Sequence, residues 1–373
     1  MYMNKTSKIC LNAMVANEAR TITRMLESCY QYIDYWVIQD NGSTDGTQDI
    51  IRNFFKEKNI PGFLYEIEWQ YPGWNRDHTL QECLKANHGC DWILRMDADE
   101  RLEVEKDFDW SIFNDTSIDS FNIIAHSYGT RYFRTWLWNA KLPWFFQHDK
   151  RHETIHLPNI GENFQRVTLS EKFKHIITND GQTWFAPRKF LKDALELESD
   201  KVVGNTVKDD TYHLWYIGKS YHDCYGNPDE FAFGKDHADE YARRAIFYFK
   251  KFLEYCHNYW VTGRPKYEDE MAYQALIMLG QAYSFIGDNV EAEKWFSLAE
   301  PFSSGRNEHW LYWAIHLDSI GEFKRSLSII ETLIRKNNLN PFPQKCFLIE
   351  DRAYTNTSNF IYEFKSNLLK KVI

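Results

Sequence analysis

The sequence predicts an α/β domain followed by an all-helical region. Two observations predict the α/β domain: short apolar segments alternate with amphipathic ones, and polar clusters follow three of the apolar segments. A third observation, a repeat with a period of 34 residues, predicts the helical region. The chain has 373 residues, which at ~100–200 residues per domain leaves room for both. We place the two domains at residues 1–185 and 186–373.

The first hundred residues alternate predicted strands with predicted helices. Strands are expected at residues 9–16, 35–39, 63–68 and 92–96, and helices at residues 18–32, 47–57 and 75–87. The first helix illustrates the pattern, because Ile22, Met25 and Cys29 recur at helical spacing. Strands that alternate with helices pair in parallel, and the ligands of such sheets bind at the carboxyl ends of the strands.

The second half of the chain carries the repeat. Gly287 and Gly321 are 34 residues apart, as are Ala292 and Ser326. The segment from residue 275 to 296 resembles a tetratricopeptide repeat, which has the same period. We expect an earlier copy to start near Tyr212, with its turn lengthened by a polar insert, and the last ~20 residues to form a capping helix.

Composition and charge exclude several classes of function. The 53 acidic residues exceed the 44 basic ones, so the net charge of −9 disfavours binding to nucleic acid or to an anionic membrane surface. We expect no transmembrane segment and no signal peptide, because no segment is apolar enough and the N-terminus is charged. The seven cysteines include no C-x-x-C pair, which disfavours a disulfide framework and a zinc ribbon. The expected location is the reducing cytoplasm.

Polar residues follow the first, second and fourth predicted strands: Asn17-Glu18, Asp40 and Asp97-Ala98-Asp99. Since the carboxyl ends of parallel strands meet at one edge of a sheet, we expect these clusters to lie close together. Two carboxylates in a D-x-D pattern can face one cation, and Mg²⁺ and Mn²⁺ prefer such oxygen ligands. The alternative is that these aspartates only form turns or cap helices.

Four segments resemble, in order, the motifs of the family 2 glycosyltransferases. Residues 37–47 read Val-Ile-Gln-Asp-Asn-Gly-Ser-Thr-Asp-Gly-Thr and closely resemble the nucleotide-binding motif of the family. The first strand ends in Asn-Glu at residues 17–18, residues 74–80 carry the expected arginine, and residues 97–100 resemble the D-x-D metal motif. The helical repeat adds a resemblance to the branch of this family that has a C-terminal tetratricopeptide region.

The resemblance implies a fold, a reaction and a metal site. The fold is the Rossmann-like GT-A fold, and the reaction is the inverting transfer of a sugar from a nucleotide-diphosphate donor. Mn²⁺ or Mg²⁺ would be held by Asp97 and Asp99, with Asp97 touching the ribose or a metal-bound water and Asp99 binding the metal directly. Such a metal stabilises charge on the leaving nucleoside diphosphate as a Lewis acid.

The resemblance also implies a set of donor-binding residues. Asp40 would hydrogen-bond the base or ribose, and Gly42 belongs to the same nucleotide-binding segment. Asn17 and Glu18 would line the nucleotide pocket. Arg76 would approach the pyrophosphate, whose oxygens suit a planar guanidinium. The structural alternatives are that Asp40 caps a turn, that the Asn-Glu pair caps the next helix and that Arg76 is merely solvated.

An inverting transfer needs a general base that takes the proton of the acceptor hydroxyl. The resemblance implies Glu153 for this role, with His152 as an orienting neighbour or a ligand. Asp149 and Asp180 remain as competing carboxylates.

Related sequences often carry a histidine in an H-x-G pattern that completes the metal shell. In this chain Asn179 or Asp180 stands at that position, and His175 is close but out of register. The identity of the third metal ligand therefore stays open.

Aromatic residues crowd segments 132–138 and 144–146. They could form a wall for a sugar acceptor, because the C–H faces of sugar rings pack on indole. The alternative is a hydrophobic hinge between the two domains.

The preferred interpretation is an inverting, metal-assisted hexosyltransferase with UDP-hexose as its default donor and a hydroxyl of a glycan or a protein as its acceptor. The helical region would hold the acceptor or mediate self-association into a homo-oligomer. The alternative is a catalytically inactive interaction scaffold, which the intact aspartates and Arg76 disfavour. A nucleotidyltransferase would need a glycine-rich or basic phosphate-binding loop, and residues 17–20 do not resemble one.

Overall fold

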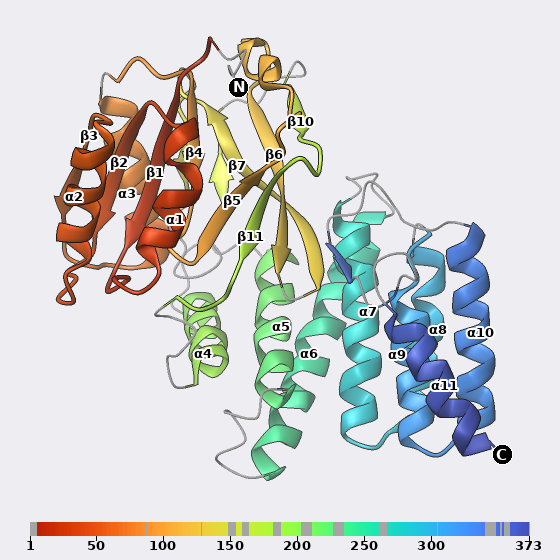
Figure 1. Cartoon of the computed structure of the whole chain (residues 1–373). Helices are drawn as coiled ribbons and strands as arrows, with labels where there is room; N and C mark the ends of the chain where they lie inside the picture. The colour runs from red at the N-terminus through yellow and green to blue at the C-terminus, as the bar shows by residue number, and fades with distance from the viewer. Residues whose placement is uncertain are drawn as a thin grey trace. The chain divides into compact units, whose positions relative to one another are not determined.

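The computed structural model (Figure 1) describes residues 6–86, 88–127, 129–147, 154–158, 164–181, 188–202, 211–226, 235–260, 267–303, 305–339, 348–350, 353 and 359–372. The chain forms two compact units. Unit 1 contains Met1–Tyr128 and Tyr132–Ala186, and unit 2 contains Gly129–Arg131 and Pro187–Ile373.

The first half of unit 1 is the predicted parallel α/β arrangement. Its strands are β1 (Ile9–Val15), β2 (Tyr35–Asp40), β3 (Gly62–Glu66) and β4 (Trp92–Arg95), in the spatial order β3-β2-β1-β4. The connecting helices are α1 (Ile22–Cys29), α2 (Thr47–Lys58) and α3 (Pro72–Lys85). Figure 1 shows α1 in front of the sheet and α3 behind it. All seven predicted elements are confirmed, although α1 begins four residues later than expected.

The second half of unit 1 extends the same sheet with mixed strand directions. The added strands are β5 (Glu100–Val104), β6 (Ser120–Ser127), β7 (Thr130–Asn139) and β11 (Phe173–Ile177), and the order continues β4-β7-β6-β11-β5. Strand β7 is antiparallel to β4, and β11 is parallel to β6 but antiparallel to β5. Short strands complete the unit: β10 (Arg166–Thr168) pairs with β6, and β8 (Phe145–Phe146) pairs with β9 (Ile155–His156).

The core of unit 1 takes up most of the aromatic stretch. Trp138, Trp144 and Phe146 are at most 2% exposed and belong to the hydrophobic core of the unit. A buried indole has no face to offer to a sugar, so the acceptor-wall interpretation is wrong for these residues. Phe145, on the neighbouring position of β8, is exposed.

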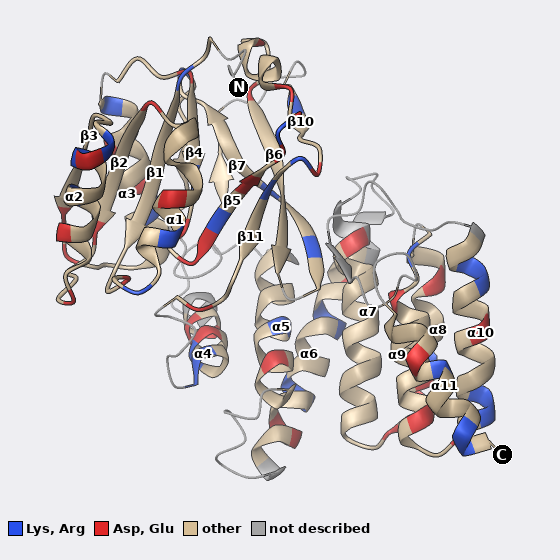
Figure 2. Cartoon of the chain, viewed as in Figure 1, with Lys and Arg blue, Asp and Glu red and all other residues tan. Residues whose placement is uncertain are grey.

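Unit 2 is helical over most of its described length. Its helices are α4 (Lys189–Val202), α5 (Thr211–Gly226), α6 (Lys235–Trp260), α7 (Tyr267–Phe285), α8 (Asn289–Leu298), α9 (Glu308–Ser319), α10 (Phe323–Leu339) and α11 (Phe360–Val372), with the short strand β12 (Leu348–Glu350) between the last two. None of the described helices is both long and apolar enough to cross a membrane. Acidic and basic residues are interspersed along these helices (Figure 2), as expected for solvated faces.

The 34-residue repeat forms two successive helical hairpins, α7–α8 and α9–α10. Each hairpin turns through a glycine in the left-handed region, Gly287 with φ 81° and Gly321 with φ 80°. Within the first hairpin, a Cβ on Gly280 would lie 2.6 Å from the ring of Phe296, so the helices approach closely only because this residue is glycine.

The expected earlier copy corresponds to α5 and α6. Gly218 faces the ring of Phe249 in the same way, since a Cβ there would lie 2.9 Å from the ring. The polar insert was expected to span residues 226–239, but α6 already begins at Lys235, and residues 227–234 lie outside the described part of the chain. Helix α11 packs against α10, which confirms the predicted capping helix.

Candidate active site

The carboxyl ends of β1, β2 and β4 lie side by side and bring the predicted clusters to one edge of the sheet. In the parallel register, Val15 pairs with Asp40 across β1 and β2, and Asn12 pairs with Arg95 across β1 and β4. The residues that follow each strand therefore share this edge, where ligands of parallel sheets bind. We call it the carboxyl edge.

Asp40 is fully buried at the end of β2, and its two carboxylate oxygens have different surroundings. Oδ2 accepts hydrogen bonds from the backbone N–H groups of Gly42 (3.1 Å) and Ser43 (2.9 Å) and from Nε2 of Gln48 (3.0 Å). Oδ1 has no hydrogen-bond partner among the described residues. Because a buried carboxylate oxygen without a partner is costly, it marks a place where a ligand donor is expected. Asp40 caps the turn with one oxygen and can offer the other to a ligand.

Asn17 and Glu18 connect the end of β1 to the loop after β2. Asn17 has a φ of 56°, which asparagine tolerates, and its Oδ1 accepts the backbone N–H of Thr44 at 2.8 Å. The N–H of Glu18 donates to Oγ1 of Thr47 at 2.9 Å. Helix α1 begins at Ile22 without a side-chain cap, so the helix-capping alternative for the Asn-Glu pair is wrong.

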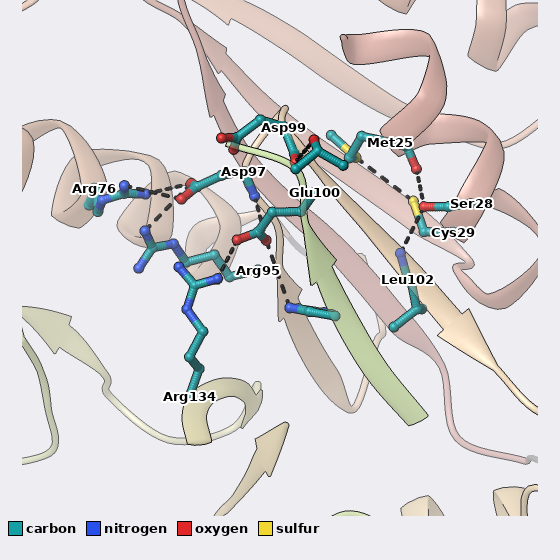
Figure 3. Close-up of polar contacts among 12 residues, drawn as sticks. Met25, Ser28, Cys29, Arg76, Arg95, Asp97, Asp99, Glu100, Leu102 and Arg134 are labelled. Carbon is teal, nitrogen blue, oxygen red and sulfur yellow. Dashed lines mark hydrogen bonds and ion pairs between the residues drawn. The ribbon is translucent and has the colours of Figure 1, made fainter. Parts of the chain in front are cut away.

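Asp97 is held by two arginines from different elements (Figure 3). Arg76 of α3 donates from Nη1 to Oδ1 at 2.9 Å and from Nη2 to Oδ2 at 3.4 Å. Arg95, the last residue of β4, places Nη2 3.5 Å from Oδ1. Burial raises the pKa of Asp97, but the charges of Arg76 and Arg95 outweigh burial and hold that pKa well below its usual range. Asp97 is therefore a stable anion, and Arg76 is not merely solvated.

Beside Asp97 lies a second ion pair that sequence reasoning missed. Arg134 of β7 pairs with the buried carboxylate of Glu100, whose Oε2 accepts the N–H of Asp97 at 3.1 Å. The centroid of the Trp136 ring lies 4.0 Å from the Cζ of Arg95 and 3.3 Å from the Cζ of Arg134. The alternation of a strand places residues 134 and 136 on one face, but it gives no sign of Glu100 as the partner of Arg134.

The carboxylate of Asp99 lies close to other carboxylates, whereas that of Asp97 is held by arginines. The Asp99 carboxylate is partly exposed and makes no hydrogen bond or ion pair with any described side chain. Burial and the negative charges of Asp97 and Glu18 raise the pKa of Asp99 to about 6. A nearby cation would relieve this repulsion, and a carboxylate oxygen is a ligand that Mn²⁺ and Mg²⁺ prefer. The donor set therefore fits a divalent metal at Asp99.

The loop after β11 packs against Asp99. Thr178 donates to the carbonyl oxygen of Asp99 from its N–H at 3.1 Å and from its Oγ1 at 2.7 Å. A Cβ on Gly181 would lie 3.2 Å from the Cβ and Cγ of Asp99, so the absence of a side chain there allows the close approach. Asn179, at the position of the expected histidine, donates from Nδ2 to Oγ of Ser127 at 2.8 Å.

Asp180 forms an ion pair with Arg24 of α1. Two guanidinium nitrogens of Arg24 donate to the carboxylate at 2.9 and 2.5 Å, and Oγ1 of Thr178 lies 2.6 Å from it and shares its one proton between Asp180 and the carbonyl oxygen of Asp99. These hydrogen bonds, with that of Arg24 the strongest, lower the pKa of Asp180 to about 2. A carboxylate of such low pKa is a weak base, which argues against Asp180 as the group that takes the acceptor proton.

The other candidates for the base lie outside the described residues: Asp149, His152 and Glu153. His175 is described and lies within the sheet on β11, fully buried, with Nδ1 3.7 Å from Oε2 of Glu100. Burial lowers the pKa of His175 to about 3, so the ring is neutral.

Three of the solved structures that resemble parts of this chain have the following identities, coverages and TM-scores. S. aureus TarS 1–349 in complex with UDP-GlcNAc is 11% identical, covers 79% of this chain and 90% of its own, and has a TM-score of 0.38. MamA is 16% identical, covers 49% of this chain and 89% of its own, and has a TM-score of 0.30. Glucosyl-3-phosphoglycerate synthase from Mycobacterium tuberculosis, in complex with Mn²⁺ and UDP-glucose, is 16% identical. It covers 32% of this chain and 44% of its own, and has a TM-score of 0.24.

Comparison at the level of sequence gives one match. No curated protein matches the chain. Residues 14–157, which contain the end of β1, the strands β2 to β4 and the carboxyl edge, match the family model described as glycosyl transferase family 2. This match confirms the resemblance of the N-terminal region to the family 2 glycosyltransferases.

Proposed function

We propose that this chain is an inverting, metal-assisted glycosyltransferase that moves a hexose from UDP-hexose to a hydroxyl group of a glycan or a protein. The observation that carries the proposal is the unequal pair of carboxylates after β4. Asp97 is neutralised by Arg76 and Arg95, whereas Asp99 faces negative charge and has no ion-pair partner among the residues that the structure describes. Together with the family match over residues 14–157, this supports a cation site beside a nucleotide site.

The buried oxygen of Asp40 supports the assignment of the nucleotide site. Oδ1 can accept an imide N–H of the base or a hydroxyl of the ribose, and the loop that contains Gly42 and Ser43 holds Oδ2 in place. Asn17 and Glu18 would form the wall of this pocket next to the loop.

The pyrophosphate of the donor would lie near the charged groups around Asp97. Arg76 is the guanidinium that we assign to its oxygens. Mn²⁺ or Mg²⁺ held at Asp99, with Asp97 close by, would stabilise the negative charge of the departing nucleoside diphosphate.

Glu153 remains our proposal for the general base. The ion pair of Asp180 with Arg24 supports this choice by making one competitor a weak base. A cytoplasmic location and a role of unit 2 in acceptor binding or self-association remain predictions of the sequence.

Thermal unfolding with added nucleotides tests the proposal. UDP, GDP, CDP and dTDP are each added with and without Mn²⁺ to wild type, to Asp99→Asn and to Asp107→Asn. Asp107 is an exposed acidic residue paired with Lys172 on the same domain, so it serves as the matched control. A ligand at 100 times its dissociation constant adds ~2.7 kcal/mol of stability. We expect a Mn²⁺-dependent shift with UDP in wild type and Asp107→Asn that is lost in Asp99→Asn.

Other outcomes would change the proposal in defined ways. A Mn²⁺-dependent shift in melting temperature with another nucleotide would still support a transferase. It would identify that nucleotide, in place of UDP, as the carrier of the donor sugar. A shift that is unaffected by Mn²⁺ and by Asp99→Asn would contradict the metal site. The absence of a shift with all four nucleotides would favour the inactive interaction scaffold.

A further inference from the structure

Three cysteines and a histidine gather at the opposite edge of the sheet, near the start of β1. Cys10 lies on β1, Cys83 lies near the end of α3, and His88 and Cys90 precede β4. The Sγ atoms of Cys10 and Cys83 are 3.4 Å apart, and Nε2 of His88 is 3.9 Å from Sγ of Cys83. The ligand atoms of these three residues all lie within 4.8 Å of one another.

We propose that this thiol cluster, made of Cys10, Cys83, His88 and Cys90, is a structural binding site for a thiophilic divalent metal such as Zn²⁺. Three cysteines and one histidine are a common structural zinc set. With Zn–S of about 2.3 Å and Zn–N of about 2.0 Å, the ligand atoms of a tetrahedral site are about 3.5–3.8 Å apart. The observed separations of 3.4 Å between the two sulfur atoms and 3.9 Å between sulfur and nitrogen are close to these values.

Cys90 is the fourth member of the cluster. Its backbone N–H donates to Nδ1 of His88 at 3.0 Å, its Sγ lies 3.9 Å from the carbonyl oxygen of His88, and its thiol contacts Cys10. Metals bind the thiolate form of cysteine. Each thiol that ligates the metal releases its proton to solvent.

His88 must change its tautomer to take part. The N–H of Cys90 donates to Nδ1 of His88 at 3.0 Å, and Nε2 lies 3.0 Å from the carbonyl oxygen of Cys83, so the neutral ring carries its proton on Nε2. A metal bound at Nε2 requires that proton on Nδ1, and the hydrogen bond from Cys90 then breaks. Gly89, with a φ of 63°, stands between the two residues. The thiolates are therefore the core of the site, and His88 joins after a local adjustment.

The cluster connects segments that are distant in sequence. A metal would cross-link β1, the end of α3 and the segment before β4, and would reduce the freedom of the unfolded chain. Cys10 and Cys83 are fully buried, Cys90 is 7% exposed and His88 is half-buried, so a metal would enter from the side of His88 and Cys90. The carboxyl edge takes no part, so the proposal is independent of the proposed function.

Metal content and metal-dependent stability test the proposal. Wild-type protein, purified without chelator, is analysed for bound metal, then stripped with chelator and titrated with Zn²⁺ or Co²⁺ alone. We expect about one equivalent of zinc, a charge-transfer band of thiolate-bound Co²⁺, and a higher melting temperature with Zn²⁺. Cys83→Ser and Cys90→Ser are compared with the matched control Cys29→Ser, which removes a thiol of α1 that is equally buried but outside the cluster. Cys90→Ser changes the least buried thiol and keeps the test valid if Cys83→Ser does not fold.

The expected result is that both cluster variants lose the Co²⁺ band and the Zn²⁺ shift, whereas Cys29→Ser keeps both. The proposal is overturned if wild type binds no metal, or if all variants respond equally. A count of fewer than seven free thiols after denaturation, with no metal found, would instead identify a disulfide within the cluster and also overturn it.

Discussion

The carboxyl edge of the sheet and the helical repeat use charged and small residues in different ways. At the carboxyl edge, Asp40 keeps a buried oxygen without a partner among the described residues, and Asp99 faces other carboxylates. In the repeat, the buried hydroxyl of Ser326 donates to the carbonyl of Ala314 at 2.7 Å, and Gly280 lets two helices meet. The edge gathers negative charge that a cation or a ligand donor can satisfy, whereas the repeat uses small residues to bring its helices close together.

The largest effect is expected from Glu153→Gln. Removal of a general base typically costs about 10²–10⁴ in rate, while the donor site remains intact. Turnover should therefore fall by that factor, and the nucleotide-dependent shift in melting temperature should be unchanged. Asp149→Asn serves as the comparison. A normal turnover rate in Glu153→Gln together with a large loss of turnover in Asp149→Asn would identify Asp149 as the general base.

The second prediction concerns packing in the repeat. Gly280→Ala places a methyl group 2.6 Å from the ring of Phe296, so we expect unit 2 to lose about 1–3 kcal/mol of unfolding free energy. Gly226→Ala in α5 is the control, because its Cβ meets nothing within 4 Å. Denaturant unfolding measures both variants. Equal stabilities would show that the ring moves aside without cost. UDP binding should not change in either.

The third prediction concerns the unpartnered oxygen of Asp40. Asp40→Asn replaces an acceptor by an N–H₂ donor near the nucleotide, so we expect about tenfold to hundredfold weaker UDP binding, equivalent to about 1.4–2.8 kcal/mol. The melting temperature without ligand should not fall, since a buried charge is removed. Calorimetric titration and a thermal melt check both parts. An unchanged affinity for UDP would show that Asp40 only caps the turn.

The smallest effect is expected from the pairing of Asp180 with Arg24. The pKa of Asp180 is lowered from 3.8 to about 2 in the folded protein, so the pair stabilises the fold above the ordinary pKa and loses this contribution as the pH falls through the folded value. Asp180→Asn should thus lower the melting temperature slightly at neutral pH, and the difference should vanish near pH 2. Asp49→Asn, an exposed acidic residue, is the control. A difference that does not depend on pH would exclude the ion pair as its cause.

The sequence predicted the elements and edges that local patterns encode. The strands before Asn17, Asp40 and Asp97 were found because apolar runs end in polar residues, and parallel pairing then placed their ends together. Contacts between distant segments were not predictable. The pairing of Arg134 with Glu100 needs the order of β7, β6, β11 and β5, which no local pattern gives.

The thiol cluster is a second contact between distant segments that the sequence did not predict. Cys10 and Cys83 are 73 residues apart, so no spacing rule for metal motifs applies to them. Only the packing of α3 on β1 brings their sulfur atoms together. The expectation of no zinc ribbon concerned local motifs, and it did not address a site assembled by the fold.

The place of β11 in the sheet sets the order in which the domain can be completed during synthesis. This strand, Phe173–Ile177, pairs with β6 on one side and with β5 on the other, and both of these strands are synthesised before it. A nascent chain that ends before residue 173 therefore leaves two strand edges without their partner, and such edges are prone to wrong pairing. The loop that packs against Asp99 follows directly after β11. The site can close only when nearly the whole of unit 1 has left the ribosome.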